Sequence, residues 1–216
     1  MQALQFGALL ASMVSTAFLV VATWTDCWMV NADDSLEVSS RCRGLWWECV
    51  TSTLDGIRTC DDYDSILAEH SLKLVLTRAL MIVADILTGF AFILLILGLD
   101  CVRLLPDHPP TKARVSLVAA AVQMAAGVPG TVGSVWYAVD VYVERTTLVI
   151  QNVFLGVQYQ WGWSCWLAMA GGLGSLLAGT ALCCCLCSHT GQGHSRALYQ
   201  AGRSATGKMY ALNTRV

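Results

Sequence analysis

Charged residues are almost missing from four long stretches of this chain of 216 residues, of which only 13% are charged. No Asp, Glu, Lys or Arg occurs from Met1 to Thr25, at 115–139 or at 146–188, and Asp85 is the single one at 79–99. A helix of about 20 apolar residues is long enough to cross the hydrocarbon of a bilayer. The composition therefore excludes an ordinary soluble domain and predicts four membrane-spanning helices.

The residue sets of common enzyme sites are also missing. The four histidines, His70, His108, His189 and His194, are scattered along the chain, and no Ser/His/Asp set, metal cluster or phosphate-binding loop accompanies them. We therefore expect no catalysis, no cofactor and no bound metal. No Asn-x-Ser/Thr sequon occurs either, which predicts an absence of N-glycosylation.

The basic residues predict the orientation of the spans. Seven Lys and Arg residues lie in the short segments 100–114 and 187–216, and short cytoplasmic segments are enriched in these residues. The first apolar segment lacks a basic flank and is longer than a signal-peptide core of about 7–15 residues, so we expect it to be retained. The predicted division is a cytoplasmic N-terminus at 1–3, spans at 4–24, 78–99, 115–138 and 163–186, outside loops at 25–77 and 139–162, a cytoplasmic loop at 100–114 and a cytoplasmic tail at 187–216.

The first outside loop is too long for a simple connection. Its Trp, Val, Thr and Cys residues, separated by polar turns, predict a compact β-sheet. The acidic stretch from Asp61 to Asp64 precedes an apolar run and predicts the start of a short helix. Three prolines at 105–112 predict a tight cytoplasmic turn, and the tail after Ser188 is polar enough to be disordered.

The spans contain features that predict helix packing. In the third span Gly127, Pro129, Gly130 and Gly133 favour a bend or a close approach of a neighbouring helix. In the fourth, Gly171, Ser175 and Gly179 form one stripe of small residues. Packing inside the bundle is the favoured explanation of this stripe, and a dimer seam is the alternative. Asp85 is expected to be protonated or hydrogen-bonded within the bundle, with Gln123 as a possible partner.

The first outside loop has a large negative net charge. Residues 25–77 contain ten carboxylates against four basic residues, a difference of −6, although the whole chain has a net charge of only −2. This excess favours cations as partners of the outside face and excludes nucleic acid.

Four cysteines, Cys27, Cys42, Cys49 and Cys60, lie in this loop. An even number of cysteines in a small extracellular unit predicts disulfides, and four cysteines allow three connectivities. A zinc site is the alternative, but the gaps between the cysteines are irregular and His70 is the loop's only histidine.

Several of these residues together form a known signature. Trp28, the run Gly44-Leu45-Trp46, Cys49, Cys60 and Arg78 resemble the W-GLW-C-C signature of the claudin family of tight-junction proteins, which wider tetraspan relatives share. The segments 32–37, 43–49 and 142–145 most resemble the magnesium-handling claudins. The resemblance implies a four-helix transmembrane bundle with a small extracellular antiparallel sheet, assembled with other claudins in cis and in trans into tight-junction strands of the cell membrane.

The resemblance also implies roles for the cysteines and tryptophans. Cys49 is expected to pair with Cys60, and Trp28 with Gly44-Leu45-Trp46 to anchor the sheet on the bundle. Cys27 and Cys42 depart from the general signature, and we predict a second disulfide between them.

Carboxylates of this loop are candidates for a cation pore. Fixed carboxylates replace part of the water that a cation loses in a narrow path. Asp61 is the first candidate, since cation-selective claudins tend to carry a carboxylate after the second signature cysteine. The weaker candidates are Asp33, Asp34, Glu48, Asp55 and Asp62. For each of them, a solvated carboxylate paired with Arg41, Arg43 or Arg58 is the alternative.

The remaining motifs lie near the membrane and at the C-terminus. Juxtamembrane cysteines are typical palmitoylation sites, which favours acylation of Cys101, Cys183 and Cys184. The final residues Thr214, Arg215 and Val216 resemble a motif that binds the PDZ domain of a junction scaffold. Tyr159, Trp161, Trp163 and Trp166 are assigned to an aromatic belt in contact with lipid.

Two functions follow from these patterns. The first is a claudin that forms cell-cell strands and a cation-selective paracellular path for magnesium, calcium or sodium. The alternative is an auxiliary tetraspan subunit that regulates a channel or receptor in the same membrane.

Overall fold

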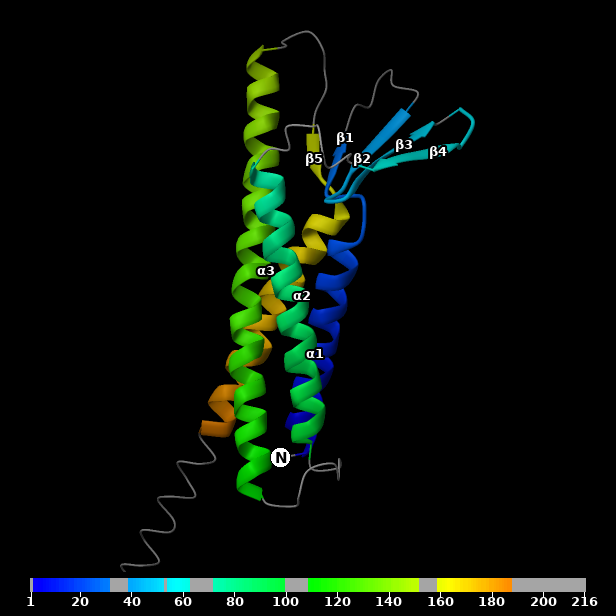
Figure 1. The fold of residues 1–216 in the computed structure, drawn as a ribbon. Coiled ribbons are helices and arrows are strands. Elements are labelled where there is room, and N and C mark those ends of the chain that lie inside the picture. Colours follow the sequence, from blue (N-terminus) through cyan, green and yellow to red (C-terminus); the bar gives the residue numbers. More distant parts are fainter. Residues whose placement is uncertain are drawn as a thin grey trace, which may run out of the picture.

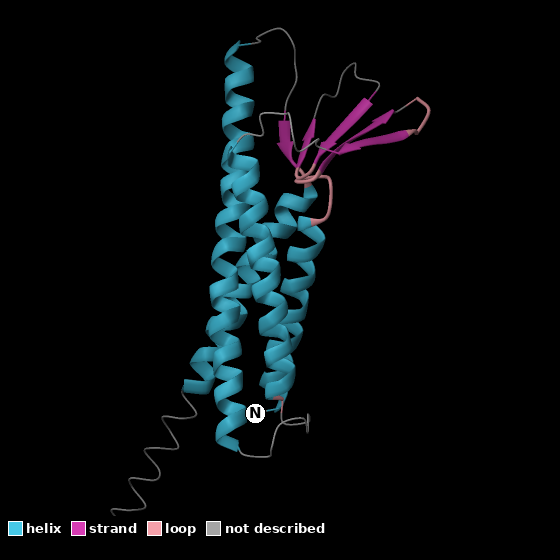
Figure 2. Cartoon of the chain, in the orientation of Figure 1, coloured by secondary structure: helices cyan, strands magenta, loops and turns pink. Residues whose placement is uncertain are grey.

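The computed structural model describes residues 2–31, 39–52, 54–62, 72–99, 109–151 and 159–187. Four helices run side by side, and all strands gather at one end of them (Figures 1 and 2). The helices are α1 (Gln2–Thr23), α2 (Leu72–Gly98), α3 (Pro109–Gln151) and a C-terminal helix (Trp163–Cys187). The strands are β1 (Met29–Asn31), β2 (Ser39–Arg43), β3 (Trp47–Ser52), β4 (Arg58–Asp62) and β5 (Tyr159–Trp161).

Each helix contains a stretch long and apolar enough to cross a membrane. These stretches are Phe6–Thr23, Lys73–Gly98, Thr111–Thr147 and Trp163–Cys187. The predicted fold class, a four-helix membrane bundle with a small antiparallel sheet, is therefore confirmed. The N-terminus lies at the end of the bundle opposite the sheet (Figure 1).

Helix α3 is longer than predicted at both ends. It begins at Pro109, inside the segment expected to form a tight turn, because proline is tolerated in the first turn of a helix. It continues to Gln151, inside the segment expected to be a loop, since no Gly or Pro follows Gly133 in this helix. Its 43 residues correspond to a length of about 65 Å, so α3 extends beyond a hydrocarbon core of about 30 Å and stands beside the sheet (Figure 1).

The sheet has five antiparallel strands in the order β4-β3-β2-β1-β5. Strand β5 comes from the second loop and pairs with β1, so residues about 130 positions apart are neighbours in one sheet. Asp61 and Asp62 belong to strand β4, and the prediction that they start a helix is therefore wrong at these two residues. The rest of that expected helix, 63–70, lies outside the described residues.

Close contacts between glycines and backbone hold the bundle together. A Cβ added to Gly172 would lie 2.7 Å from the backbone nitrogen of Thr131, and one added to Gly127 would lie 2.9 Å from the carbonyl oxygen of Gly172. Helix α3 and the C-terminal helix therefore touch through their backbones, which only residues without a side chain allow. Pro129 lies within α3 at this contact.

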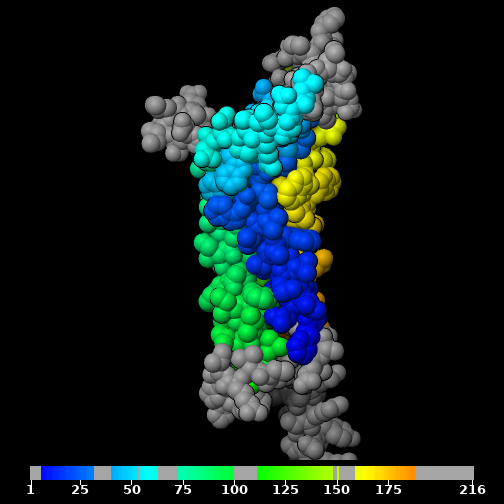
Figure 3. Space-filling view, turned by 90° about the vertical axis from the view of Figure 1, so that its right-hand side faces the viewer, coloured from blue at the N-terminus to red at the C-terminus, as the bar shows by residue number. Residues whose placement is uncertain are grey.

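The small-residue stripe of the C-terminal helix packs inside the bundle, as favoured from the sequence. Gly171 faces α1 at Leu19, and Gly179 faces Met124 of α3. Ser175 accepts a hydrogen bond from the amide of Gln123, whose carbonyl accepts another from Ser12. Figure 3 shows α1 lying between α2 and the C-terminal helix, below the sheet.

The expected contact between Asp85 and Gln123 does not occur. Gln123 is fully buried and uses its amide group for Ser12 and Ser175. Asp85 lies instead against the side chain of Thr23 on α1.

Candidate functional site: the sheet anchor and the acidic edge strand

Trp28 connects the sheet to the bundle. Its side chain is fully buried, and its indole nitrogen donates a hydrogen bond of 2.7 Å to the carbonyl of Ala22 near the end of α1. Its ring meets Tyr137 of α3 edge-on, with 5.0 Å between the centroids. One side chain thus contacts two helices directly before strand β1 begins. The hydrogen bond satisfies the indole N–H, which would be costly to bury unpaired.

The Gly44-Leu45-Trp46 turn forms a second connection. Trp46 stacks on Trp24 at 5.6 Å and donates a hydrogen bond of 2.9 Å to the carbonyl of Thr23. A Cβ on Gly44 would lie 2.6 Å from the Cα of Asp26, so this position requires glycine. Leu45, the middle residue of this turn, is fully buried.

Arg78 of α2 holds the same turn from the opposite side. Its Nε donates a hydrogen bond of 2.6 Å to the carbonyl of Leu45, and its guanidinium lies over the ring of Trp46, 5.1 Å from the centroid. The position combines a charge-assisted hydrogen bond with a cation–π contact, which a lysine could not reproduce. The turn is thereby connected to both α1 and α2.

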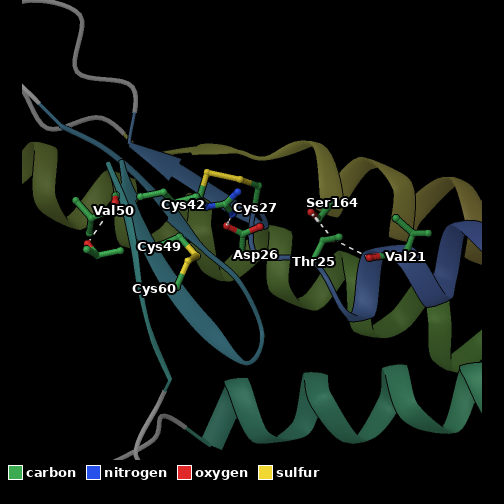
Figure 4. Close-up of polar contacts among 11 residues, drawn as sticks. Val21, Thr25, Asp26, Cys27, Cys42, Cys49, Val50, Cys60 and Ser164 are labelled. Carbon is green, nitrogen blue, oxygen red and sulfur yellow. Dashed lines mark hydrogen bonds and ion pairs between the residues drawn. A yellow bond between two sulfur atoms is a disulfide. The ribbon is translucent and has the colours of Figure 1, made fainter. Parts of the chain in front are cut away.

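Both predicted disulfides are present, as Figure 4 shows. Cys49 and Cys60 are directly opposite each other on β3 and β4, and Cys27 joins the segment after α1 to Cys42 of β2. Asp26, Cys27 and Cys42 lie close enough together to hold a metal ion. The two thiols are consumed by the disulfide, however, so this cluster offers no thiolate and does not suit zinc.

One ion pair joins the sheet to the segment after α1, and another joins α2 to α3. Buried Asp26 pairs with Arg58 of β4, beside the Cys27–Cys42 disulfide (Figure 4). Lys73 at the start of α2 pairs with Asp140 of α3. No role for Asp26, Lys73 or Asp140 was predicted from the sequence. For Lys73 and Asp140 the sequence does contain a signal, because each is an isolated charge at the edge of an apolar span.

Arg43 of β2 lies between two carboxylates. Its Nε is 3.4 Å from Glu48 of β3, and another guanidinium nitrogen is 3.7 Å from Glu144 of α3. One cation is therefore shared by two anions, which leaves this group with an excess of negative charge.

Asp61 extends this acidic group to the edge of the sheet. It is directly opposite Glu48, which is directly opposite Arg43 on the next strand, so these three side chains share one face. Every residue of β4 is exposed, and among the described residues Asp61 has no ion-pair partner. Asp62 is opposite Trp47 and therefore belongs to the other face. The row Arg43, Glu48 and Asp61 is called the acidic row below.

The other sequence-predicted residues are distributed as follows. Asp55 is exposed in the turn between β3 and β4. Cys183 and Cys184 are not in disulfides and lie near the end of the C-terminal helix, at the end of the bundle opposite the sheet. Outside the described residues lie Asp33, Asp34, Cys101, Thr214, Arg215 and Val216.

A four-helix membrane bundle with a disulfide-bonded, tryptophan-anchored sheet at one end defines a class of tetraspan membrane proteins. Residues 1–182 match the model of the PMP-22/EMP/MP20/Claudin family. The chain belongs to this family and, within it, to the claudins of the tight junction.

Individual relatives agree with this assignment. The chain is 60% identical to mouse claudin-16 over 231 aligned residues, covering 99% of this chain and 98% of the relative. It is 69% identical to human claudin-16 over 183 residues, covering 85% of this chain and 78% of the relative. It is 30% identical to mouse claudin-7 over 196 residues, with 89% of both chains covered. Claudins are junction proteins that interact with other claudins, and membership among them does not point to an enzyme.

Proposed function

We propose that this claudin forms a cation-selective path between neighbouring cells, for magnesium, calcium or sodium, with its acidic row facing the path. The sheet end is then outside the cell, and both termini are in the cytoplasm. The seven basic residues of 100–114 and 187–216 support this orientation, since short cytoplasmic segments are rich in Lys and Arg.

The pairing of Glu48 with Asp61 is the observation that carries the proposal. Side chains directly opposite each other on antiparallel strands have Cβ atoms about 4.5–5.5 Å apart, and two like charges at this distance destabilise the sheet. Arg43 compensates only part of this charge, because Glu144 shares it. A passing cation relieves the remaining repulsion.

The exposure of strand β4 suits a transient site. Two unit charges 4 Å apart interact by about 1 kcal/mol in water and by more beside protein. Interactions of this size replace part of the hydration of an ion without trapping it. The loop's excess of six carboxylates over basic residues raises the local concentration of cations in the same way.

Neutralising Asp61 is the test of this proposal. In an epithelial monolayer that expresses the chain, Asp61→Asn should lower the sodium-to-chloride permeability ratio by roughly fivefold, the factor that corresponds to about 1 kcal/mol. Dilution potentials measure this ratio, and biionic potentials then rank sodium, magnesium and calcium.

The matched control is Asp62→Asn, which removes the same charge from the next residue of the same exposed strand but from the opposite face. Its permeability ratio should stay close to that of the unchanged chain. An unchanged ratio in Asp61→Asn, or an equal loss in both variants, would contradict the proposed role of the acidic row.

The C-terminal residues Thr214, Arg215 and Val216 are proposed to bind a PDZ scaffold of the junction. A terminal Val fills an apolar pocket while backbone amides hold its carboxylate. Adding one glycine after Val216 removes both features and should abolish capture by an immobilised PDZ scaffold. An Ala inserted before Lys208 leaves the terminus intact and should preserve binding. Retention of the extended chain would count against this motif.

Lipid is a further proposed partner, through acylation of Cys183 and Cys184. Both lie at the end of the C-terminal helix and neither is in a disulfide, and Cys184 is exposed. Cys101 remains a candidate from its juxtamembrane place in the sequence.

A further inference from the structure

A groove of about 580 Å³ runs along the outer surface of the bundle, between α1 and the C-terminal helix. These two helices are neighbours on the face that Figure 3 shows. The floor of the groove consists of small residues from both helices, namely Ala11, Ser15, Ala170, Gly174 and Ala178. Larger apolar side chains, which are exposed, form its walls: Leu10, Val14, Phe18 and Leu177.

The floor of the groove is a second stripe of small residues on the C-terminal helix. The first stripe, from Gly171 to Gly179, packs inside the bundle. The second consists of the residues one position earlier, which line the groove: Ala170, Gly174 and Ala178. On α1, Gly7 is exposed one turn before Ala11, and a Cβ added to Gly7 would meet nothing within 4 Å. Small residues spaced in this way allow a further transmembrane helix to approach until the backbones touch.

A buried hydroxyl group in the floor lacks a partner. Ser15 is only 6% exposed, and its side chain forms no hydrogen bond with any of the described residues. The other buried serines of the described residues each take part in one: Ser12, Ser116, Ser134, Ser164 and Ser175. The Ser15 Oγ lies 2.5 Å from the point that a Cβ of Gly174 would occupy, so the missing side chain of Gly174 leaves the hydroxyl open to the groove. An unpaired hydroxyl in hydrocarbon is costly, which favours a hydrogen-bond partner from outside the chain.

The depth of Ser15 in the membrane decides which kind of partner fits. Ser15 lies near the middle of the apolar stretch Phe6–Thr23, and Gly174 lies near the middle of Trp163–Cys187. The polar groups of lipids and sterols lie at the surface of the hydrocarbon, about 15 Å from its centre, and acyl chains offer no hydrogen-bond acceptor. A transmembrane helix brings polar groups to this depth. The groove therefore suits a helix better than a lipid.

We propose that a second copy of this chain occupies the groove, with the α1 helices of the two copies in parallel contact at Ala11 and Ser15. A two-fold axis along the membrane normal places Ser15 of both copies at the same depth. A hydroxyl both donates and accepts, so the two groups satisfy each other. A helix of an unrelated protein has a polar residue at this depth only by coincidence, whereas a second copy always has one. This contact joins two claudins within one membrane and does not depend on the acidic row or on cation permeation.

The test is self-association of the full chain in phosphatidylcholine vesicles. Donor and acceptor dyes are attached to the N-terminus, because α1 begins there and the two labels of a dimer lie close together. Energy transfer above chance proximity should fall as the vesicles are diluted with lipid, which gives the dissociation constant of the dimer. A chain that stays monomeric at every ratio of protein to lipid would leave the groove to lipid and overturn the proposal.

Two groove variants test where the copies meet. Ser15→Ala removes the shared hydrogen bond and should raise the dissociation constant roughly fivefold. Ala11→Leu fills the floor of the groove and should raise it about tenfold or more.

Each groove variant has a matched control. Ser12→Ala removes a hydroxyl from the same helix, but one that is bonded to Gln123 inside the bundle. Ala125→Leu enlarges an exposed alanine on α3, away from the groove. Both controls should leave the dissociation constant unchanged, and thermal unfolding establishes that each variant is folded. Association that survives both groove variants, or that the controls weaken equally, would contradict a contact through this groove.

Discussion

Replacing Trp28 with alanine should destabilise the protein by about 3–5 kcal/mol, the usual cost of removing a large buried aromatic side chain. The side chain is fully buried, contacts Tyr137 and bonds to the carbonyl of Ala22, so the variant loses packing against α3 and a hydrogen bond to α1. The sheet would then lose the connection that Trp28 makes to α1 and α3. Thermal unfolding in detergent, followed by circular dichroism, measures the loss.

Trp163→Ala is the matched control for this change. Trp163 lies at the same end of the bundle but is 49% exposed, so its replacement should cost much less. Delivery of the two variants to the cell surface should follow the same order. Equal unfolding temperatures for Trp28→Ala and Trp163→Ala would show that Trp28 does not anchor the sheet.

Replacing Gly172 with alanine is the second change with a large expected effect. The added Cβ would lie 2.7 Å from the backbone nitrogen of Thr131 and 2.9 Å from the backbone carbon of Gly130. Backbone atoms cannot yield as a flexible side chain can, so α3 and the C-terminal helix must separate. Overpacking of this kind costs about 1–3 kcal/mol, which the same thermal unfolding measures.

Gly89→Ala provides the comparison, since a Cβ at this position of α2 meets nothing within 4 Å. It should be neutral or stabilise the protein by up to about 1 kcal/mol, the difference in helix propensity between the two residues. If Gly172→Ala were as stable as Gly89→Ala, the close backbone contact would not be a feature of the folded protein.

Properties that depend on neighbouring residues in the sequence could be predicted well. Long apolar runs suffice to predict four spans, because each must satisfy its backbone hydrogen bonds within one helix. The signature residues identified the anchor through resemblance, and the structure adds the contacts of Trp28, Trp46 and Arg78.

The ends of the helices were harder to predict. Pro109 and the residues after 138 were expected to lie outside the third span, yet both belong to α3. Hydropathy marks where a helix leaves the membrane and carries little information on where the helix itself ends. Proline is tolerated at the start of a helix, and the residues after 138 contain no breaker.

For the candidate site too, the sequence predicts the residue types, and the tertiary structure decides how they are arranged. The residue types of the first loop already establish an acidic, cysteine-rich unit on a membrane bundle, because charge and hydropathy are sums over the chain. The arrangement of these charges depends on strand register, on β5 joining from 159–161, and on the proximity of Arg43 to Glu144. These pairings link residues distant in the sequence, and a shift of one residue in register would place Asp61 on the other face of the sheet. Tertiary contacts alone therefore separate Asp61 from Asp62 and bring Glu48 opposite Asp61, whereas composition predicts only that carboxylates are abundant there.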